Sequence, residues 1–136
     1  MAVNWTEEQK KAIEKSGCNL IVAAAAGSGK TAVLVEKIVN MVENGTDIDS
    51  LLVTTFTDAA AKKMKQEIGN EIKNRLVSDK DNDRLARQLV LLGRADICTI
   101  DSFCMKVVRA NFHLLDIDPD FKIADNNEGE LLRRQA

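Results

Sequence analysis

The sequence has little of the residue types on which many enzyme sites depend. It contains one histidine, His113, so a multi-histidine metal site and most Ser-His catalytic sites are excluded. Its three cysteines form an odd set without a C-x-x-C pair, which predicts reduced thiols and argues against a disulfide framework or a zinc site. Because His113 comes late in an apolar helical stretch, we expect it to be structural.

Long apolar runs and a strong net charge are also missing. The longest unbroken apolar run, 20–26, is far too short to span a bilayer, and segment 1–11 is too polar for a signal peptide. We therefore expect a soluble, cytoplasmic protein with no membrane partner. The 19 basic and 21 acidic side chains leave a formal charge of -2, so any contact with DNA has to be local.

What is present is the pattern of a single globular α/β domain. The chain has 136 residues, of which 45% are hydrophobic and 29% charged. Short apolar runs alternate with longer amphipathic ones, which predicts a parallel sheet flanked by crossover helices. We expect strands over 20–24, 51–56 and 97–100, and helices over 7–16, from about 30 to Asn44-Gly45, from Asp58 onward, around 85–92 and over 102–115.

Local signals refine these expectations. Thr6 and Gln9 have the spacing of a capping box, and Asp58 is a plausible N-cap. Lysines at 62, 63 and 65 fit either a solvated helix face or a DNA contact. Two sets of apolar residues should face inward, Ala60, Met64, Ile68, Ile72 and Leu76 on one helix and Phe103, Val107, Ala110 and Leu114 on another.

The strongest signal is the run Ala-Ala-Ala-Gly-Ser-Gly-Lys-Thr at 24–31, between a predicted strand and a predicted helix. Gly27 and Gly29 allow close approach of the backbone to phosphate oxygens, and the helix N-terminus directs N–H groups at them. Lys30 would reach the β- and γ-phosphates of ATP, and the Thr31 hydroxyl would ligate Mg²⁺. A turn that only joins a strand to a helix needs neither side chain.

We therefore predict ATP and Mg²⁺ as cofactors, with Lys30 and Thr31 as catalytic residues. Gln9 is open to two interpretations: it closes the capping box, or its amide reads the adenine edge, and the two can coexist on different atoms. The predicted cofactor-binding set is Gln9, Ala24, Ala25, Ala26, Gly27, Ser28, Gly29, Lys30 and Thr31, with Ala24 where the general phosphate-loop pattern has glycine.

Segments 5–9, 24–31, 53–61 and 99–104, in this order and spacing, resemble the start of superfamily 1A DNA helicases of the UvrD and Rep kind. The resemblance extends to the AddA helicase-nuclease subunits through 87–92 and 118–125, so it covers nearly the whole chain. It implies a P-loop NTPase of RecA-like fold, with 1–115 as the first part of the ATP-binding domain and 116–136 as an acidic segment leading into the remainder.

The same resemblance assigns roles to individual residues. It favours adenine contact for Gln9, and it places Phe56 along single-stranded DNA, where an aromatic ring can stack on any base. Without the resemblance, Phe56 would be a core aromatic at a strand end. The implied DNA-binding set is Thr55, Phe56, Thr57, Thr99 and Ser102, and the implied partners are single-stranded DNA, duplex ends and, in a heterodimer, an AddB-type second subunit.

Acidic residues for ATP hydrolysis are not evident, because no apolar strand ends in Asp-Glu. We therefore expect an N-terminal fragment of an ATP-dependent helicase-nuclease subunit that moves 3'-to-5' on DNA and processes broken ends, with little ATPase activity in the fragment itself. The alternatives are a non-catalytic nucleotide-binding module and a small P-loop kinase, in which Asp101 follows the strand over 97–100 and holds Mg²⁺ through water.

Overall fold

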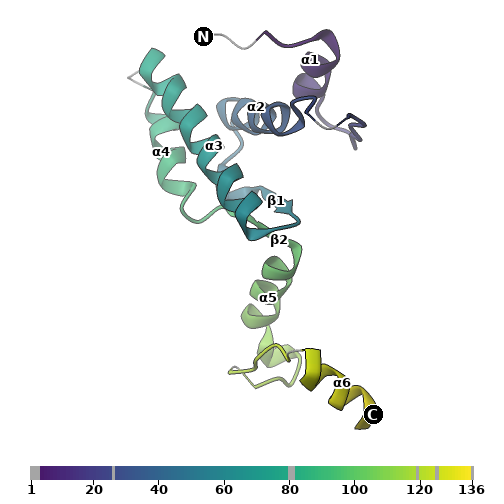
Figure 1. The fold of residues 1–136 in the computed structure, drawn as a ribbon. Coiled ribbons are helices and arrows are strands. Elements are labelled where there is room, and N and C mark those ends of the chain that lie inside the picture. The colour runs from purple at the N-terminus through teal and green to yellow at the C-terminus, as the bar shows by residue number, and fades with distance from the viewer. Residues whose placement is uncertain (1–3, 26, 80–81, 119, 125, 136) are drawn as a thin grey trace. The chain divides into compact units, whose positions relative to one another are not determined.

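The computed structural model describes residues 4–25, 27–79, 82–118, 120–124 and 126–135, which form an α/β structure with a small parallel sheet (Figure 1). The chain divides into one compact unit that ends at Ile100 and a second that begins at Asp101. Within the described ranges, no helix is long and apolar enough to cross a membrane. The elements in chain order are α1 (Glu7–Glu14), α2 (Lys30–Glu43), a 3₁₀ turn (Ile48–Ser50), β1 (Leu52–Thr55), α3 (Asp58–Ser78), α4 (Asp83–Leu91), β2 (Asp96–Thr99), α5 (Ile100–Ala110), a second 3₁₀ turn (Phe112–Leu114) and α6 (Asn126–Gln135).

The sheet of the first unit consists of β1 and β2, which pair in parallel and are connected through α3 and α4. The register places Leu52 opposite Asp96 and Thr55 opposite Thr99. The carboxyl ends of both strands therefore lie at the same edge of the sheet. Both strands were expected from the sequence; β1 is shorter than the predicted 51–56, and β2 has the predicted length but begins one residue earlier than 97.

The core of the first unit lies between α2, α3, α4 and the two strands. The predicted stripe on α3 buries Met64, Ile68 and Ile72, whereas Ala60 is exposed and its neighbour Ala61 is buried instead. Gly69 belongs to the same helix face, and a Cβ there would lie 3.1 Å from Leu92 Cδ2. The absence of a side chain at this position therefore lets α3 approach α4 closely.

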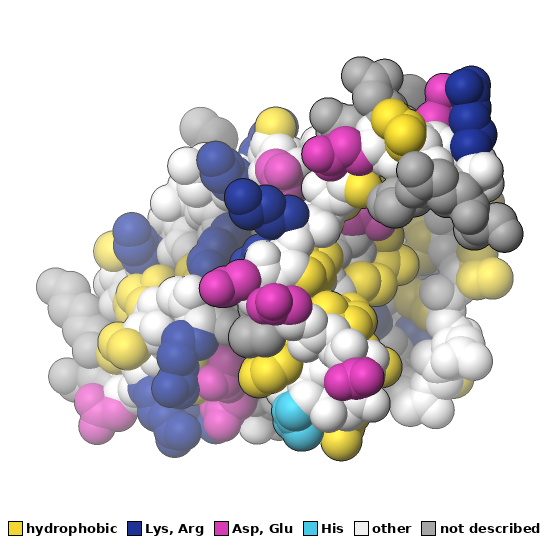
Figure 2. Space-filling model, turned by 90° about the horizontal axis from the view of Figure 1, so that it is seen from below, with side chains coloured by type: hydrophobic (Ala, Val, Ile, Leu, Met, Phe, Trp, Pro, Cys, Tyr) yellow, Lys and Arg dark blue, Asp and Glu magenta, His cyan; other side chains and the backbone are white. Residues whose placement is uncertain are grey.

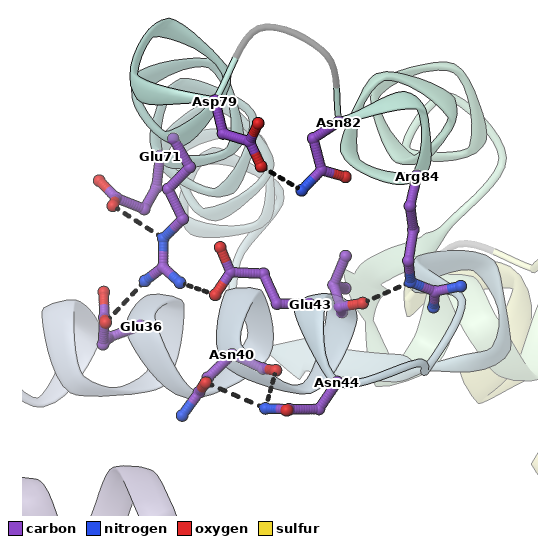
Figure 3. A network of polar contacts seen from close by, with 10 residues as sticks. Glu36, Asn40, Glu43, Asn44, Glu71, Asp79, Asn82 and Arg84 are labelled. Carbon is purple, nitrogen blue, oxygen red and sulfur yellow. Dashed lines mark hydrogen bonds and ion pairs between the residues drawn. The ribbon is translucent and has the colours of Figure 1, made fainter.

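Two polar clusters link elements of the first unit, one between α4 and the first 3₁₀ turn and one between α2 and α3. Gln88 on α4 is fully buried; its Oε1 accepts from the Ile48 N–H at 2.8 Å, and its Nε2 donates to Asp47 Oδ1 at 2.7 Å. Figure 3 shows the second cluster, in which Glu36 and Glu43 of α2 and Glu71 of α3 surround the guanidinium of Arg75. Burial lowers the pKa of Arg75, but the three carboxylates more than reverse this and raise its pKa above the ordinary value.

The strand predicted over 20–24 is wrong for this structure. The described residues 19–25 have no regular secondary structure, and Leu20, Ile21 and Val22 are 42%, 94% and 49% exposed. A strand needs a neighbour that pairs with its N–H and C=O groups, and here β1 and β2 pair only with each other. The apolar composition of this segment is therefore not sufficient to make it a strand.

Two predicted helix boundaries also need correction. The N-cap of α3 is Thr57 and not Asp58, because Thr57 is extended (φ -137°, ψ 149°) and its hydroxyl accepts from the Ala60 N–H at 3.1 Å. The first helix ends at Glu14 and not at 16, since Lys15 is already extended (φ -62°, ψ 122°). The predicted capping box between Thr6 and Gln9 is confirmed.

In the second unit, the predicted single helix over 102–115 is interrupted. α5 ends at Ala110, and the side chain of Asn111 donates to the Val107 carbonyl at 2.8 Å, which competes with continuation of the helix. The expected inward face is also wrong: Phe103 is half-buried, whereas Val107, Ala110 and Leu114 are exposed. Hydrophobic side chains are visible on the face of the molecule drawn in Figure 2.

Candidate functional site

The loop before α2, which the sequence predicts as a phosphate site, contains two glycines with positive φ. Gly27 and Gly29 have φ values of 78° and 81°, a region that side chains with a Cβ rarely adopt. The Ser28 N–H donates to the Ala25 carbonyl at 3.3 Å, which closes a turn just before the N-cap of α2. Ala26 belongs to the predicted cofactor-binding set but lies outside the described residues.

The N-terminus of α2 is open toward this loop. Its N-cap is Gly29, which makes no side-chain cap hydrogen bond, and its first turn contains no acidic side chain. The first N–H groups of a helix have no partner within the helix and carry a partial positive charge, so this end of α2 suits a phosphate group. Thr31, the predicted Mg²⁺ ligand, is exposed in the same first turn.

Lys30 turns back over the loop. Its Nζ donates to the carbonyls of Ala24 and Ala25, both at 2.8 Å. An ammonium group has three donors and no acceptor, so at least one N–H is left over from these two contacts. The structure therefore brings together the catalytic candidate Lys30 and two members of the predicted cofactor-binding set.

Gln9 connects α1 to the same loop, and its capping interpretation is confirmed, whereas adenine contact stays a prediction. Its Oε1 accepts from the Thr6 N–H at 2.9 Å, and its Nε2 donates to the Ser28 carbonyl at 3.2 Å. These partners fix the orientation of the amide, since the first is a donor and the second an acceptor. One amide N–H and one Oε1 lone pair remain, which is the donor and acceptor pair that an adenine edge requires.

A cavity of about 290 Å³ lies between α1 and the loop. Its size is near the lower end of ordinary small-molecule sites. Glu8 also lines the cavity, and its own backbone N–H and then the Thr6 hydroxyl lower the pKa of its carboxyl, so its negative charge disfavours phosphate beside it. The lining residues are Thr6, Glu8, Gln9, Ala12, Val22, Ala23, Ala24, Ser28, Lys30 and Val33.

The residues fit a nucleotide better than they fit a metal ion alone. Over the ranges that the structure describes, no group of three or more His, Cys, Asp or Glu side chains is arranged to hold a metal. Mg²⁺ takes oxygen ligands in octahedral geometry, and Thr31 offers one hydroxyl oxygen. The Mg²⁺ ion predicted from the sequence would therefore depend on nucleotide phosphates for further ligands.

A second group of predicted residues lies at the carboxyl edge of the sheet. Thr55 ends β1, Thr99 ends β2, and the two are register partners. In parallel α/β sheets, ligands bind at the carboxyl ends of the strands. Thr57 follows at the N-cap of α3, where its hydroxyl accepts from Ala60 and keeps its own O–H available for donation.

Phe56 lies between Thr55 and Thr57 in the chain and is not part of the core. Its side chain is fully exposed at 104% relative accessibility. The interpretation of Phe56 as a core aromatic is therefore wrong, and an exposed ring is free to stack on a base. Ser102 lies in α5 within the second compact unit.

The remaining charged candidates are the lysines of α3 and Asp101. Lys65 donates to the Gly93 carbonyl at 3.0 Å and Lys63 approaches Glu67 at 3.7 Å, which fits a solvated helix face. Asp101, the Mg²⁺ ligand of the kinase alternative, lies in the first turn of α5 rather than in a loop after a strand.

The sequence did not identify several residues that line the cavity, nor the lysine that links α2 to α1. Val22 and Val33 line the cavity but looked like ordinary core positions. Lys37 of α2 donates to the carbonyls of Ala12 and Ile13 in α1. Its spacing of seven residues from Lys30, two helical turns, was the one available signal that both lysines share a face of α2.

The chain is similar to known helicase proteins over nearly its whole length. Residues 5–136 match the family described as UvrD/REP helicase N-terminal domain. The chain is 54% identical over 136 residues to an ATP-dependent helicase/nuclease subunit of Clostridium acetobutylicum, covering 98% of this chain and 11% of that protein. The protein of the same name from Thermoanaerobacter sp. is 55% identical over 139 residues, covering 100% and 11%.

A third relative, the protein of the same name from Clostridioides difficile, is 52% identical over 135 residues, covering 97% of this chain and 11% of its own length. The chain thus spans about 11% of the length of each of these relatives. Since the family match at residues 5–136 covers almost the whole chain, the chain belongs to the UvrD/REP helicase N-terminal domain family.

Proposed function

We propose that this chain is the ATP-binding N-terminal part of an ATP-dependent DNA helicase/nuclease subunit of the AddA type. The observation that carries the proposal is the loop at 24–31, where Lys30 and the amide of Gln9 meet beside the uncapped N-terminus of α2. We assign 1–115 to the first part of a RecA-like ATP-binding domain and 116–136 to an acidic connecting segment. The parent enzyme would act in the cytoplasm, moving 3'-to-5' on DNA and processing double-strand breaks.

Each residue of the loop has a defined task in this proposal. The N–H groups at 27–31 and the Lys30 ammonium hold the triphosphate, the Thr31 hydroxyl gives one ligand to Mg²⁺, and Gln9 contacts adenine. Bound ATP supplies the phosphoryl-transfer free energy that drives movement on DNA. Lys30 has to exchange the carbonyls of Ala24 and Ala25 for phosphate oxygens, so its ammonium moves when the nucleotide binds.

The DNA-facing part of the proposal rests on the carboxyl edge of the sheet. The exposed ring of Phe56 stacks on a base without selecting its identity, while the hydroxyls of Thr55, Thr57 and Thr99 contact the DNA backbone. Ser102 belongs to the second compact unit, and a DNA contact by its hydroxyl is proposed separately from this edge. Single-stranded DNA and duplex ends are the proposed substrates. We further propose that the partner in a heterodimer is of the AddB type, because the relatives are named as subunits.

A thermal-shift titration with ATP and Mg²⁺ tests nucleotide binding by this chain. Binding to the native state at a hundredfold excess over Kd stabilises it by about 2.7 kcal/mol, which raises Tm by several degrees. Lys30→Ala should abolish this shift. Lys73→Ala, which removes an exposed lysine from α3, is the matched control and should keep the shift.

Two results would contradict the proposal. One is an unchanged Tm of the unmodified chain at millimolar ATP, which would mean that the loop is only a scaffold. The other is substantial ATP turnover that disappears in Lys30→Ala, because the proposal assigns the acidic hydrolytic residues to other parts of the enzyme.

A further inference from the structure

Lys37 makes an unusual set of contacts with the C-terminal end of α1. It is half-buried on α2, and its Nζ donates to the carbonyls of Ala12 at 3.0 Å and Ile13 at 3.2 Å, and also to the carbonyl of Lys15. All three carbonyls belong to the C-terminal end of α1, where a helix leaves its last C=O groups without partners. A cation at this end is also favoured by the helix dipole.

The remaining attachment of α1 is thin. The helix has eight residues, which is too short to be stable by itself in water. Its apolar contact is a small cluster in which Ala12 and Ile13 pack on Val33, with Trp5 partly covering them, and this cluster is separate from the main core. Polar contacts therefore contribute strongly to where α1 lies.

These polar contacts hold α1 at both ends. At the N-terminal end, Gln9 donates to the Ser28 carbonyl of the phosphate loop. At the C-terminal end, Lys37 binds the three carbonyls from α2, the helix that begins with Lys30. Since α2 also carries the phosphate-binding N-terminus, Lys37 fixes the distance between the group that contacts the base and the groups that contact the phosphates.

We propose that Lys37 is a positioning residue for base recognition: it holds α1 so that the Gln9 amide faces the nucleotide, without touching the nucleotide itself. The inference rests on the proposed function, because it presupposes that ATP binds at the loop. Removal of the ammonium should let α1 shift and carry Gln9 away from Ser28. The phosphate-binding groups of α2 and the loop would stay in place.

The test compares two ligands, ATP and inorganic tripolyphosphate, by calorimetry on the whole chain with Mg²⁺. Lys37→Met keeps the aliphatic stem and removes the three hydrogen bonds. It should raise the Kd for ATP roughly tenfold, as expected for loss of the hydrogen bonding between Gln9 and the base, and should change the Kd for tripolyphosphate by less than about twofold. Lys37→Arg should restore most of the ATP affinity, and Lys11→Met, which removes an exposed lysine from the same helix end, is the control.

A double-mutant cycle separates positioning from a general effect on folding. In a Gln9→Ala background, Lys37→Met should cause little further loss of ATP affinity, because both changes remove the same base contact. If Lys37→Met lowers the far-UV circular dichroism signal, Lys37→Gln replaces it with the same expected direction.

Three outcomes have distinct meanings. Equal weakening of ATP and tripolyphosphate would overturn the inference and indicate a general structural role. Unchanged ATP affinity in Lys37→Met would also overturn it, while the proposed function would stand. Failure of the unmodified chain to bind either ligand would overturn the proposed function, and the inference with it.

Discussion

Gln88 offers a direct test of how the first unit is held together. Gln88→Leu keeps the side chain's approximate volume, so little cavity forms, but it removes two hydrogen bonds, from the Ile48 N–H at 2.8 Å and to Asp47 Oδ1 at 2.7 Å. Because Ile48 and Gln88 are both fully buried, the Ile48 N–H then has no access to water, which costs about 1–3 kcal/mol. Asp47 is 37% exposed, so water can replace part of the hydrogen bond that it loses. Loss of this second hydrogen bond therefore costs only about 1 kcal/mol more.

We therefore expect Gln88→Leu to lower the free energy of unfolding by about 3 kcal/mol, a large part of the stability of an ordinary domain. Urea unfolding followed by far-UV circular dichroism measures this directly, and the slope with urea should stay unchanged. Gln66→Leu on the exposed face of α3 is the control and should lie within about 0.5 kcal/mol of the unmodified chain. A Gln88→Leu variant as stable as the control would refute the assignment of Gln88 as a buried polar link.

Two further predictions concern charge and DNA contact. Arg75→Met leaves Glu36, Glu43 and Glu71 without their shared cation and should cost about 2–3 kcal/mol at pH 7. Because the pKa of Arg75 is raised in the folded chain, its contribution to stability is fully present below its ordinary pKa and is lost only as the pH rises through the raised value. The stability difference between Arg75→Met and the unmodified chain should therefore stay unchanged from pH 7 to about pH 10, and a difference that shrinks over this range would contradict the prediction. Phe56→Ala should lower affinity for an oligo(dT) strand roughly tenfold by fluorescence anisotropy. Its fully exposed ring predicts unchanged stability, so a destabilised variant with normal DNA affinity would count against stacking.

Local signals in the sequence predicted those parts of the site that depend on neighbours along the chain. The capping box of Thr6 and Gln9 forms because both partners lie within one helical turn. The positive φ values of Gly27 and Gly29 and the start of α2 at Lys30 likewise follow from residues that stand next to one another. These features place the phosphate loop without knowledge of the tertiary structure.

Features that depend on distant partners were missed. The segment 20–24 has the composition of a strand but no strand to pair with, and Gln88 looks like a surface residue until the Ile48 N–H, forty positions earlier, is placed against it. The N-cap of α3 differs for another reason: Thr57 and Asp58 are both good caps, and the extended backbone of Thr57 decides between them. Lys37 was overlooked because its acceptors are backbone carbonyls, which no sequence pattern identifies.

The most direct test of the central claim is an amide NMR titration of the ¹⁵N-labelled chain with ATP and Mg²⁺. The largest shift changes should occur at the backbone N–H groups of Gly27, Ser28, Gly29 and Thr31 and at the side-chain amide of Gln9, since these groups face the proposed nucleotide. Lys30→Ala should remove the changes while leaving the rest of the spectrum in place. Saturable changes centred elsewhere, for example around Asp101, or no changes at millimolar ATP, would contradict the assignment of this loop as the nucleotide site.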